Sequence, residues 1–301
     1  MSSRGLIAYL VTPLARDGHR AGTELFEPYV DRLLERCAPA GIACLANDFP
    51  YFGEEERRNI AAAVLRSVRG RVPVHVCTSA IATHQAIALS KHAEDLGAAK
   101  VVINPQSYLP LADDQILTHY DRIAKALRIP VHVYNNPAAT RTDMSVGLLR
   151  RIVDATGARS IKEAGSRVEK FQQLRQEFGD EVVLHVGFHY MALGGFALGA
   201  SAWDVGLVPS IAAPCDRLYR AAVVDGNLAE AKKLFFALLP LFQFFQEKGA
   251  LRSLKALGEI DGLELGGTRA PIEMLRSEEI EDLRRRLEQA TQFTKGTGHA
   301  R

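Results

Sequence analysis

The sequence predicts an α/β fold, a (β/α)8 barrel with additional C-terminal helices. Short apolar runs rich in β-branched residues alternate regularly with amphipathic helical stretches over residues 1–225. The runs are apolar almost throughout, which is typical of parallel strands buried on both faces. The other parallel architecture, a doubly wound open sheet, would usually bind a nucleotide, and no GxGxxG or GxxxxGK pattern follows a run. These observations together favour the barrel.

The expected elements repeat as strand and helix. Strands are expected at 5–13, 42–47, 72–79, 100–105, 131–137, 159–165, 181–188 and 201–209. Helices between them are expected at 54–70, 82–98, 113–127, 145–157 and 166–179. Glycines stand where helix C-caps belong, at Gly70, Gly97, Gly157 and Gly179. Eight such units are what a (β/α)8 barrel requires.

The strand pattern stops after about residue 226. Helices are expected at 227–249, 251–260 and 277–293, followed by a frayed tail. We therefore expect a barrel domain over residues 1–225 and a helical extension over 226–301 packed on it. The most apolar stretch, 234–245, is well short of the ~20 residues of a membrane span. It is interpreted as core or subunit-interface material.

Composition points to a soluble cytoplasmic protein. The formal net charge is only +2, and the arginines at 284–286 fall in a helical pattern beside Glu278, Glu279 and Glu281, which is typical of a solvated helix face, so no nucleic acid is expected. The N-terminus lacks the features of a signal peptide, and no membrane association is expected. Four scattered cysteines without a CxxC pair suit a reducing compartment and indicate neither a disulfide framework nor a zinc site.

Two strand ends carry the candidate chemistry. The stretch "VHVYNNP" has Tyr134 and "RSIKEAG" has Lys162 near the C-terminal end of consecutive strands, where barrel active sites lie. An amine held in a barrel mouth loses solvation, which lowers its pKa and frees it to attack a ketone. The alternative is a lysine paired with Glu163, but neighbouring residues of a strand point to opposite sides. Tyr134 is expected beside Lys162, as a proton relay or as an ordinary rim aromatic.

These motifs resemble those of the dihydrodipicolinate synthase/N-acetylneuraminate lyase family. The similarity of "VYNNP" and "IKEAG" extends to "GRVPVHV", "LGAAKVVINP" and "KALGEIDGLELGGTRAPIEML", and so covers nearly the whole chain. The family comprises class I, Schiff-base pyruvate-dependent lyases on a TIM barrel. The resemblance implies Lys162 as the Schiff-base lysine and Tyr134 as the proton relay. It implies no cofactor, since the lysine is itself the catalyst, and a homodimer or homotetramer.

The sequence departs from the family pattern in the loops. Asn47 and Asp48 of "LANDFPYFGEEER" stand where the family has the two threonines of a GTTGE-like loop that binds the keto-acid carboxylate. Ser107 stands where the synthases have a tyrosine, and Tyr108 follows one residue late. Ala139 stands where the synthases have an arginine that binds a second carboxylate, and the next arginine of this chain follows two residues later. The chain is therefore not expected to be a true dihydrodipicolinate synthase.

The expected reaction starts when the Lys162 amine condenses with the C2 ketone of a 2-keto acid. The resulting iminium acidifies C3 or weakens the C3–C4 bond, so dehydration and aldol cleavage both remain open. The "LAN" loop resembles the dehydratase branch, which favours a 2-keto-3-deoxy sugar acid as substrate. We expect the hydroxylated end of this substrate to be bound by Asn47, Asp48, Ser107, Tyr108 and His189.

Two other hypotheses remain. A metal-dependent keto-acid aldolase could use His185 and His189, but residues four apart in a strand lie ~13 Å from each other, too far for one metal. The sequence therefore predicts no metal. The altered carboxylate loop could instead mark a catalytically impaired protein that senses a keto acid. Retention of both Lys162 and Tyr134 argues against this, because a binding module needs no imine-forming pair.

Overall fold

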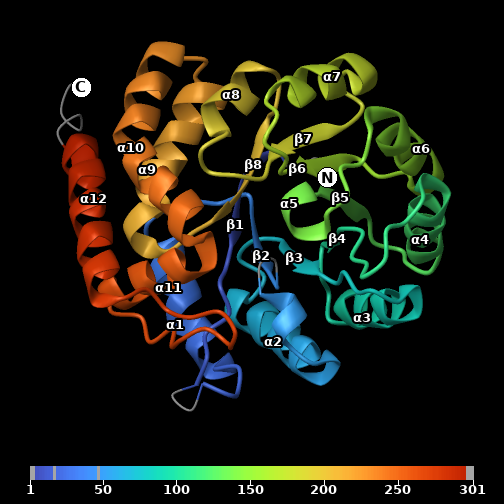
Figure 1. The fold of residues 1–301 in the computed structure, drawn as a ribbon, viewed down its shortest axis with the longest axis horizontal. Helices are drawn as coiled ribbons and strands as arrows, with labels where there is room; N and C mark the ends of the chain where they lie inside the picture. Colours follow the sequence, from blue (N-terminus) through green and yellow to red (C-terminus); the bar gives the residue numbers. More distant parts are fainter. Residues whose placement is uncertain (1–3, 16–17, 46–47, 296–301) are drawn as a thin grey trace.

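The computed structural model describes residues 4–15, 18–45 and 48–295. Its strands β1 to β8 follow one another in sequence order around a closed barrel, and every pairing is parallel (Figure 1). This confirms the predicted fold class. The strands are β1 Gly5–Tyr9, β2 Gly41–Cys44, β3 Val74–Cys77, β4 Lys100–Ile103, β5 Val131–Asn135, β6 Ser160–Glu163, β7 Val183–Val186 and β8 Ala202–Gly206.

Helices surround the barrel on the outside of the strands (Figure 1). They are α1 Phe26–Leu34, α2 Glu54–Val68, α3 Thr83–Asp95, α4 Asp113–Lys125, α5 Pro137–Thr140, α6 Val146–Thr156, α7 Glu169–Phe178, α8 Ala192–Ala197 and α9 Pro209–Tyr219. Local sequence fixes their ends. In α6, for example, the Ser145 side chain accepts a hydrogen bond from the Leu148 N–H at 3.1 Å, and Gly157 closes the helix at φ 66°.

Side chains that alternate along each strand face two different environments, the layer under the helices and the interior of the barrel. In β1, Leu6 and Ala8 join the large apolar core, whereas Ile7 and Tyr9 form a small separate cluster with Ala43. Because side chains in a strand alternate between its two faces, one set packs under the helices and the other fills the barrel. The barrel interior is thus a distinct compartment, which holds the candidate chemistry.

The C-terminal helices cover one side of the barrel (Figure 1). They are α10 Leu228–Lys248, α11 Ala250–Ile260 and α12 Ser277–Lys295. α10 is anchored by aromatic packing, with the Phe242 ring 6.2 Å from that of Trp203 in β8. Phe236 on the same helix is 62% exposed, so the Phe-rich stretch has a buried and an outward side. Among the described residues, no helix is both long and apolar enough to traverse a lipid bilayer.

Close packing of α8 on the barrel accounts for the glycine-rich stretch 194–199. A Cβ atom added at Gly195 would lie 2.5 Å from Cγ2 of Val186 in β7, closer than real contacts allow. Only glycine lets the helix backbone approach the strand this closely. The glycine at position 195 thus serves the packing of α8 on β7.

We expect Gly195→Ala to lower the free energy of unfolding by about 1–3 kcal/mol, because the added methyl group overpacks the helix–strand contact. The matched control is Gly147→Ala in α6, where the nearest atom to an added Cβ is Ser145 Oγ at 4.0 Å. That change should be neutral or stabilise by about 0.5–1 kcal/mol, since alanine favours the helix. Urea denaturation of both variants measures the difference. Equal effects at the two positions would contradict the packing argument.

Candidate active site

Lys162 lies inside the barrel between two aromatic rings. The strand register pairs Tyr134 of β5 directly with Lys162 of β6, which confirms their predicted adjacency. The Lys162 Nζ atom is 4.2 Å from the centroid of the Tyr134 ring and 3.7 Å from that of Tyr9 in β1. The lysine is only 3% exposed. The amine therefore lies between the faces of the two rings, in a site with little access to water.

This environment favours the reactive form of the amine. Burial lowers the pKa of Lys162 to about 8, while the charge of Asp204 acts in the opposite direction. Aromatic faces also attract the ammonium form and limit the fall. The result is an amine that is partly unprotonated near neutral pH, as a nucleophile for carbonyl addition requires.

Glu163 points away from Lys162, as strand alternation predicts. Its carboxylate accepts a hydrogen bond from Asn135 Nδ2 at 2.9 Å and one from the Gly165 N–H at 2.5 Å. Lys170 of α7 lies 3.4 Å from the same carboxylate. Glu163 thus has its own partners between barrel and helices, and Lys162 is left without a directly bonded carboxylate among the described residues.

Tyr134 offers a protonated phenol beside the amine. Its hydroxyl accepts a hydrogen bond from Asn136 Nδ2 at 2.8 Å. Burial raises the pKa of Tyr134 above its ordinary value, so the hydroxyl keeps its proton at neutral pH. A phenol that accepts one hydrogen bond still has its own proton to donate, which suits it to pass a proton to and from a neighbouring reacting atom.

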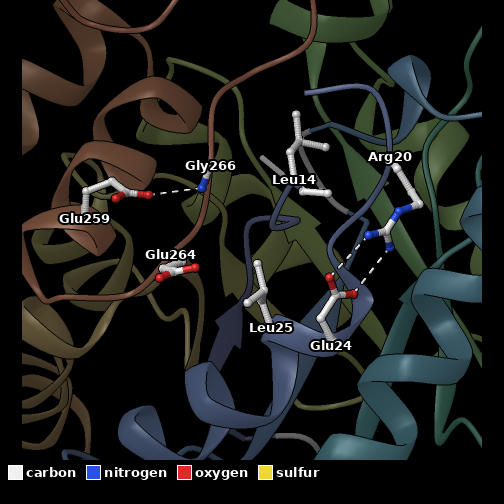
Figure 2. A pocket seen from close by; sticks show the side chains of 8 residues that line it. Leu14, Arg20, Glu24, Leu25, Glu259, Glu264 and Gly266 are labelled. Carbon is white, nitrogen blue, oxygen red and sulfur yellow. Dashed lines mark hydrogen bonds and ion pairs between the residues drawn. The ribbon is translucent and has the colours of Figure 1, made fainter. Parts of the chain in front are cut away.

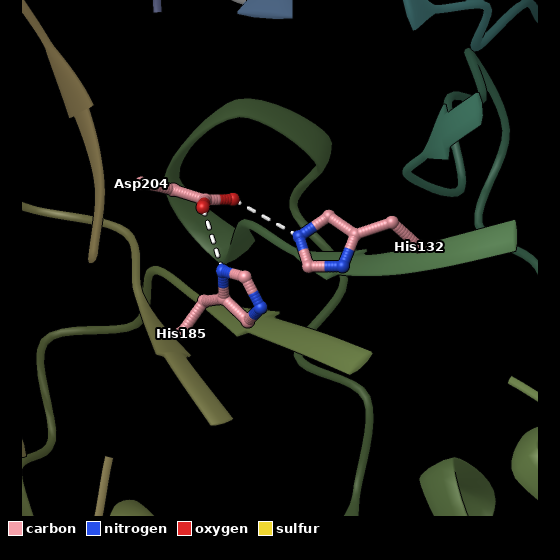
Figure 3. A group of neighbouring side chains, drawn as sticks. All are labelled: His132, His185 and Asp204. Carbon is pink, nitrogen blue, oxygen red and sulfur yellow. Dashed lines mark hydrogen bonds and ion pairs between the residues drawn. The ribbon is translucent and has the colours of Figure 1, made fainter. Parts of the chain in front are cut away.

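A buried carboxylate, that of Asp204, is bonded to two histidines of strands β5 and β7 (Figure 3). Asp204 accepts hydrogen bonds from the Tyr9 hydroxyl at 2.8 Å, from His132 Nε2 at 2.9 Å and from His185 Nδ1 at 2.7 Å. Burial alone would raise the pKa of Asp204, but His185 and His132 hold it well below its ordinary value. Burial lowers the pKa of His132 to about 3, so this imidazole is neutral. The site therefore contains one fixed negative charge.

These three residues are also the described group whose geometry comes nearest to a metal site. One ligand atom from each of His132, His185 and Asp204 lies within 4.8 Å of the others. The three side chains, however, already bond to one another and are buried. They form a hydrogen-bonded network around Asp204, in which the Nε2 atom of His185 has no hydrogen-bond partner among the described residues. The hypothetical pair of His185 and His189 does not form a site, because His189 instead lies 3.1 Å from the Gly206 carbonyl oxygen.

A cavity of about 560 Å³ opens beside the lysine, at the C-terminal ends of β5, β6 and β7. Ala164 and Gly165, directly after β6, form part of its wall, together with Phe188 and His189 after β7. A Cβ atom added at Gly187 would lie 3.1 Å from Lys162 Cε, so the lysine stem lies directly under this loop. Lys162 itself is not among the lining residues, and the cavity lies over the loops that follow β6 and β7, next to the lysine stem.

The structure brings only one predicted binding residue to this cavity, namely His189. Asp48 accepts a hydrogen bond from the Thr12 N–H at 3.0 Å and lines a separate, much smaller space. Ser107 bonds to the Leu109 carbonyl oxygen at 2.6 Å, and Tyr108 is 91% exposed. Asn47 lies outside the described residues.

A further cavity, of about 640 Å³, is lined by residues of the segments 14–15, 20–25 and 259–266 (Figure 2). Several of its polar side chains have partners within the cavity wall: Arg20 bonds to Glu24 at 3.4 Å, and Glu259 accepts from the backbone N–H of Gly266 at 3.0 Å. No predicted site residue lines it. Its glutamates would repel a keto-acid carboxylate, so its larger volume does not make it the better candidate.

Sequence reasoning missed Tyr9 and His132. His132 stands two residues before Tyr134 in β5, so strand periodicity alone could have placed its side chain in the barrel. Tyr9 had no such local signal, because its place beside Asp204 depends on the pairing of β1 with β8. The aromatic wall from α10 was likewise missed, since the Phe-rich stretch was interpreted as core or interface.

Comparison with known proteins gives consistent similarities. The model of the dihydrodipicolinate synthetase family matches residues 2–290. The chain is 27% identical over 275 residues to 4-hydroxy-tetrahydrodipicolinate synthase of Thermomicrobium roseum, covering 89% of this chain and 88% of that one. For the Bartonella henselae enzyme of the same name the identity is 30% over 246 residues, covering 79% and 81%.

Solved structures agree. A putative dihydrodipicolinate synthetase from Pseudomonas aeruginosa superposes with a TM-score of 0.92 at 31% identity, covering 96% of this chain and all (100%) of that one. A catalytic lysine mutant of sialic acid aldolase from Ruminococcus gnavus has a TM-score of 0.89 at 19% identity, covering 98% and 97%. The latter likeness concerns the fold alone.

Burial of Lys162 leads to a pH-dependent stability prediction. The folded pKa of about 8 is below the ordinary 10.5, so the unfolded chain binds more protons between these values and stability rises with pH across that window. Below pH 8 the buried ammonium costs up to about 3 kcal/mol, at about 1.4 kcal/mol for each pKa unit. Lys162→Met should therefore be more stable than wild type at pH 7, and the advantage should vanish by about pH 10.5.

Chemical denaturation across pH 7 to 10.5 measures this difference. Lys170→Met is the matched control, because this lysine is equally buried but lies 3.4 Å from Glu163. Its loss should destabilise by about 3–5 kcal/mol, since it leaves a buried carboxylate without its cation. An advantage of Lys162→Met that stays constant with pH would show that burial does not suppress the charge of the amine.

Proposed function

Since the chain belongs to the dihydrodipicolinate synthetase family, we propose that it is a Schiff-base lyase acting on a 2-keto acid, with Lys162 as the imine-forming residue and Tyr134 as the proton relay. The observation that carries the proposal is the Lys162 amine, buried between the Tyr9 and Tyr134 rings with a pKa of about 8. Few other functions require an unprotonated lysine beside a phenol at a barrel mouth.

In the proposed mechanism the neutral amine attacks the C2 ketone and forms a carbinolamine. Loss of water gives the iminium, and the Tyr134 hydroxyl supplies and removes the protons of these steps. The iminium then draws electrons from C3, which permits either loss of a C4 hydroxyl or cleavage of C3–C4. The keto acid of a 3-deoxy sugar is the substrate class that the sequence favours. Action as a cytoplasmic homodimer or homotetramer remains our expectation.

The buried charge supports the same chemistry. Asp204 carries a fixed negative charge, and its partner Tyr9 lies against the amine. A negative charge near the lysine stabilises the positively charged iminium relative to neutral intermediates. The carboxylate of Asp204 bonds to the Tyr9 hydroxyl and not directly to Lys162. The amine is therefore not held in its ammonium form by a direct ion pair.

A second candidate is the activity in the relatives' names, synthesis of 4-hydroxy-tetrahydrodipicolinate. Overall similarity favours it. Against it stands Ala139, exposed at the position where the resemblance calls for a carboxylate-binding arginine. The nearby Arg141 is exposed as well, at φ 57°. The prediction that this chain is not such a synthase therefore stays a prediction, and the ligand-sensing alternative predicts thermal stabilisation by a keto acid without turnover.

Reduction with borohydride in the presence of pyruvate tests the lysine directly. We expect a stable pyruvyl adduct on Lys162 and none in Lys162→Arg, whose guanidinium stays protonated and does not form an imine. Lys255 provides the control, because burial also lowers its pKa to about 8 while its Nζ is bonded to the Leu265 carbonyl oxygen at 3.1 Å. Peptide mass analysis should find the adduct in Lys255→Arg at the wild-type position. An adduct on Lys255 alone would refute the assignment.

Tyr134→Phe tests the proton relay. The ring against Lys162 is retained and only the hydroxyl is lost, so we expect turnover of the keto acid to fall by about 10²–10⁴-fold, as for loss of a general acid–base group. The adduct should still form, more slowly, because the amine itself is unchanged. Unaltered turnover in a folded Tyr134→Phe variant would assign Tyr134 the merely structural role of a rim aromatic.

A further inference from the structure

We propose that the cavity beside Lys162 binds an aromatic ring, so that the substrate is a 4-hydroxy-2-keto acid with an aryl group at C4. This inference rests on the proposed function and specifies the end group of its substrate. It differs from the sugar-acid substrate that the sequence favours, and the lining of the cavity is the reason.

Four aromatic side chains, from two separate segments, line the cavity. Phe188 and Tyr190 follow β7 and stack on each other at 5.5 Å with planes 22° apart. Phe242 and Phe245 project from α10, with ring centroids 6.3 Å apart. Such faces and edges recognise a flat apolar ring through burial and offset or edge-to-face contacts.

No charged side chain is among the described residues that line the cavity. His189 is neutral, because burial lowers its pKa to about 4, and its Nε2 atom already lies 3.1 Å from the Gly206 carbonyl oxygen. Ser166 and Gln246 are exposed at the rim. The hydroxyl groups of a sugar chain would lose water here without gaining enough partners, and unpaired buried polar groups weaken binding strongly.

The position and size of the cavity match the end of such a substrate. An imine at Lys162 fixes C2, and C4 is two bonds away. The wall begins two residues after Lys162, at Ala164, and continues to Phe188, next to the Gly187 that covers the lysine stem. A volume of about 560 Å³ is within the usual range of small-ligand sites and accommodates a ring with a short chain.

The reaction balances without a cofactor. In the iminium of the 4-aryl-4-hydroxy-2-keto acid, the C3–C4 bond breaks and its electron pair forms the enamine. The C4 hydroxyl gives up its proton, which yields an aryl aldehyde. The enamine takes a proton at C3, and water hydrolyses the imine to release pyruvate and the free lysine. Tyr134, whose ring centroid lies 4.2 Å from the Lys162 Nζ atom, relays these protons through its hydroxyl.

The test compares pyruvate release from 4-hydroxy-2-oxo-4-phenylbutanoate and from 2-keto-3-deoxygluconate, after borohydride trapping with pyruvate on the same protein. We expect kcat/KM to be about 100-fold higher for the phenyl compound, the scale set by buried groups left unpaired. Phe245→Leu should raise KM for this compound by roughly tenfold, since a contacting ring is lost while the wall stays apolar. Phe236→Leu, on the outward side of the same helix, should leave it unchanged.

The outcomes separate the two proposals. An adduct on Lys162 combined with a preference for the sugar acid, or with no turnover of the phenyl compound, overturns the aryl substrate and leaves the lyase standing. Equal effects of Phe245→Leu and Phe236→Leu would also overturn it. Failure of pyruvate and both keto acids to form an adduct in the folded protein would refute the lyase itself.

Discussion

The structure depends on one placement, that of the Lys162 amine between the rings of Tyr9 and Tyr134, with the hydroxyl of Tyr9 bonded to the carboxylate of Asp204. Loss of water lowers the pKa of the amine, while the ring faces and the carboxylate oppose that change. The balance leaves a lysine with a pKa of about 8, which neither a fully solvated nor a directly ion-paired lysine would have. Every proposed step begins from this amine.

The placement requires a closed barrel. Tyr9 belongs to β1, Tyr134 to β5, Lys162 to β6 and Asp204 to β8, so the group forms only when β1 pairs with β8. A neutral His132 and the His185 ring keep Asp204 in place and ionised. A carboxylate without such partners would gain a proton on burial, and the site would lose its negative charge.

How much could be predicted from the sequence depends on how far apart along the chain the interacting residues lie. The strands and the adjacency of Tyr134 and Lys162 were predictable, because apolar runs are local and consecutive parallel strands are neighbours. The hydrogen bond between Tyr9 and Asp204 joins residues 195 positions apart, and no local pattern indicates it. Phe242 and Phe245 gave an apolar signal, but only the packing of α10 shows that they line a cavity.

In the proposed site, residues on the strands set the reactivity of the lysine, and residues outside the strands set the choice of substrate. The groups that set the pKa of Lys162 and move protons lie on strands, where eight paired backbones hold them rigidly. The cavity wall comes from the segment after β7 and from α10, which can change without disturbing the barrel. A polar end group would need hydrogen-bonding side chains on these segments, and this chain instead has phenylalanines there. On our proposal, residues that take no part in the lysine chemistry thereby direct it to an apolar substrate.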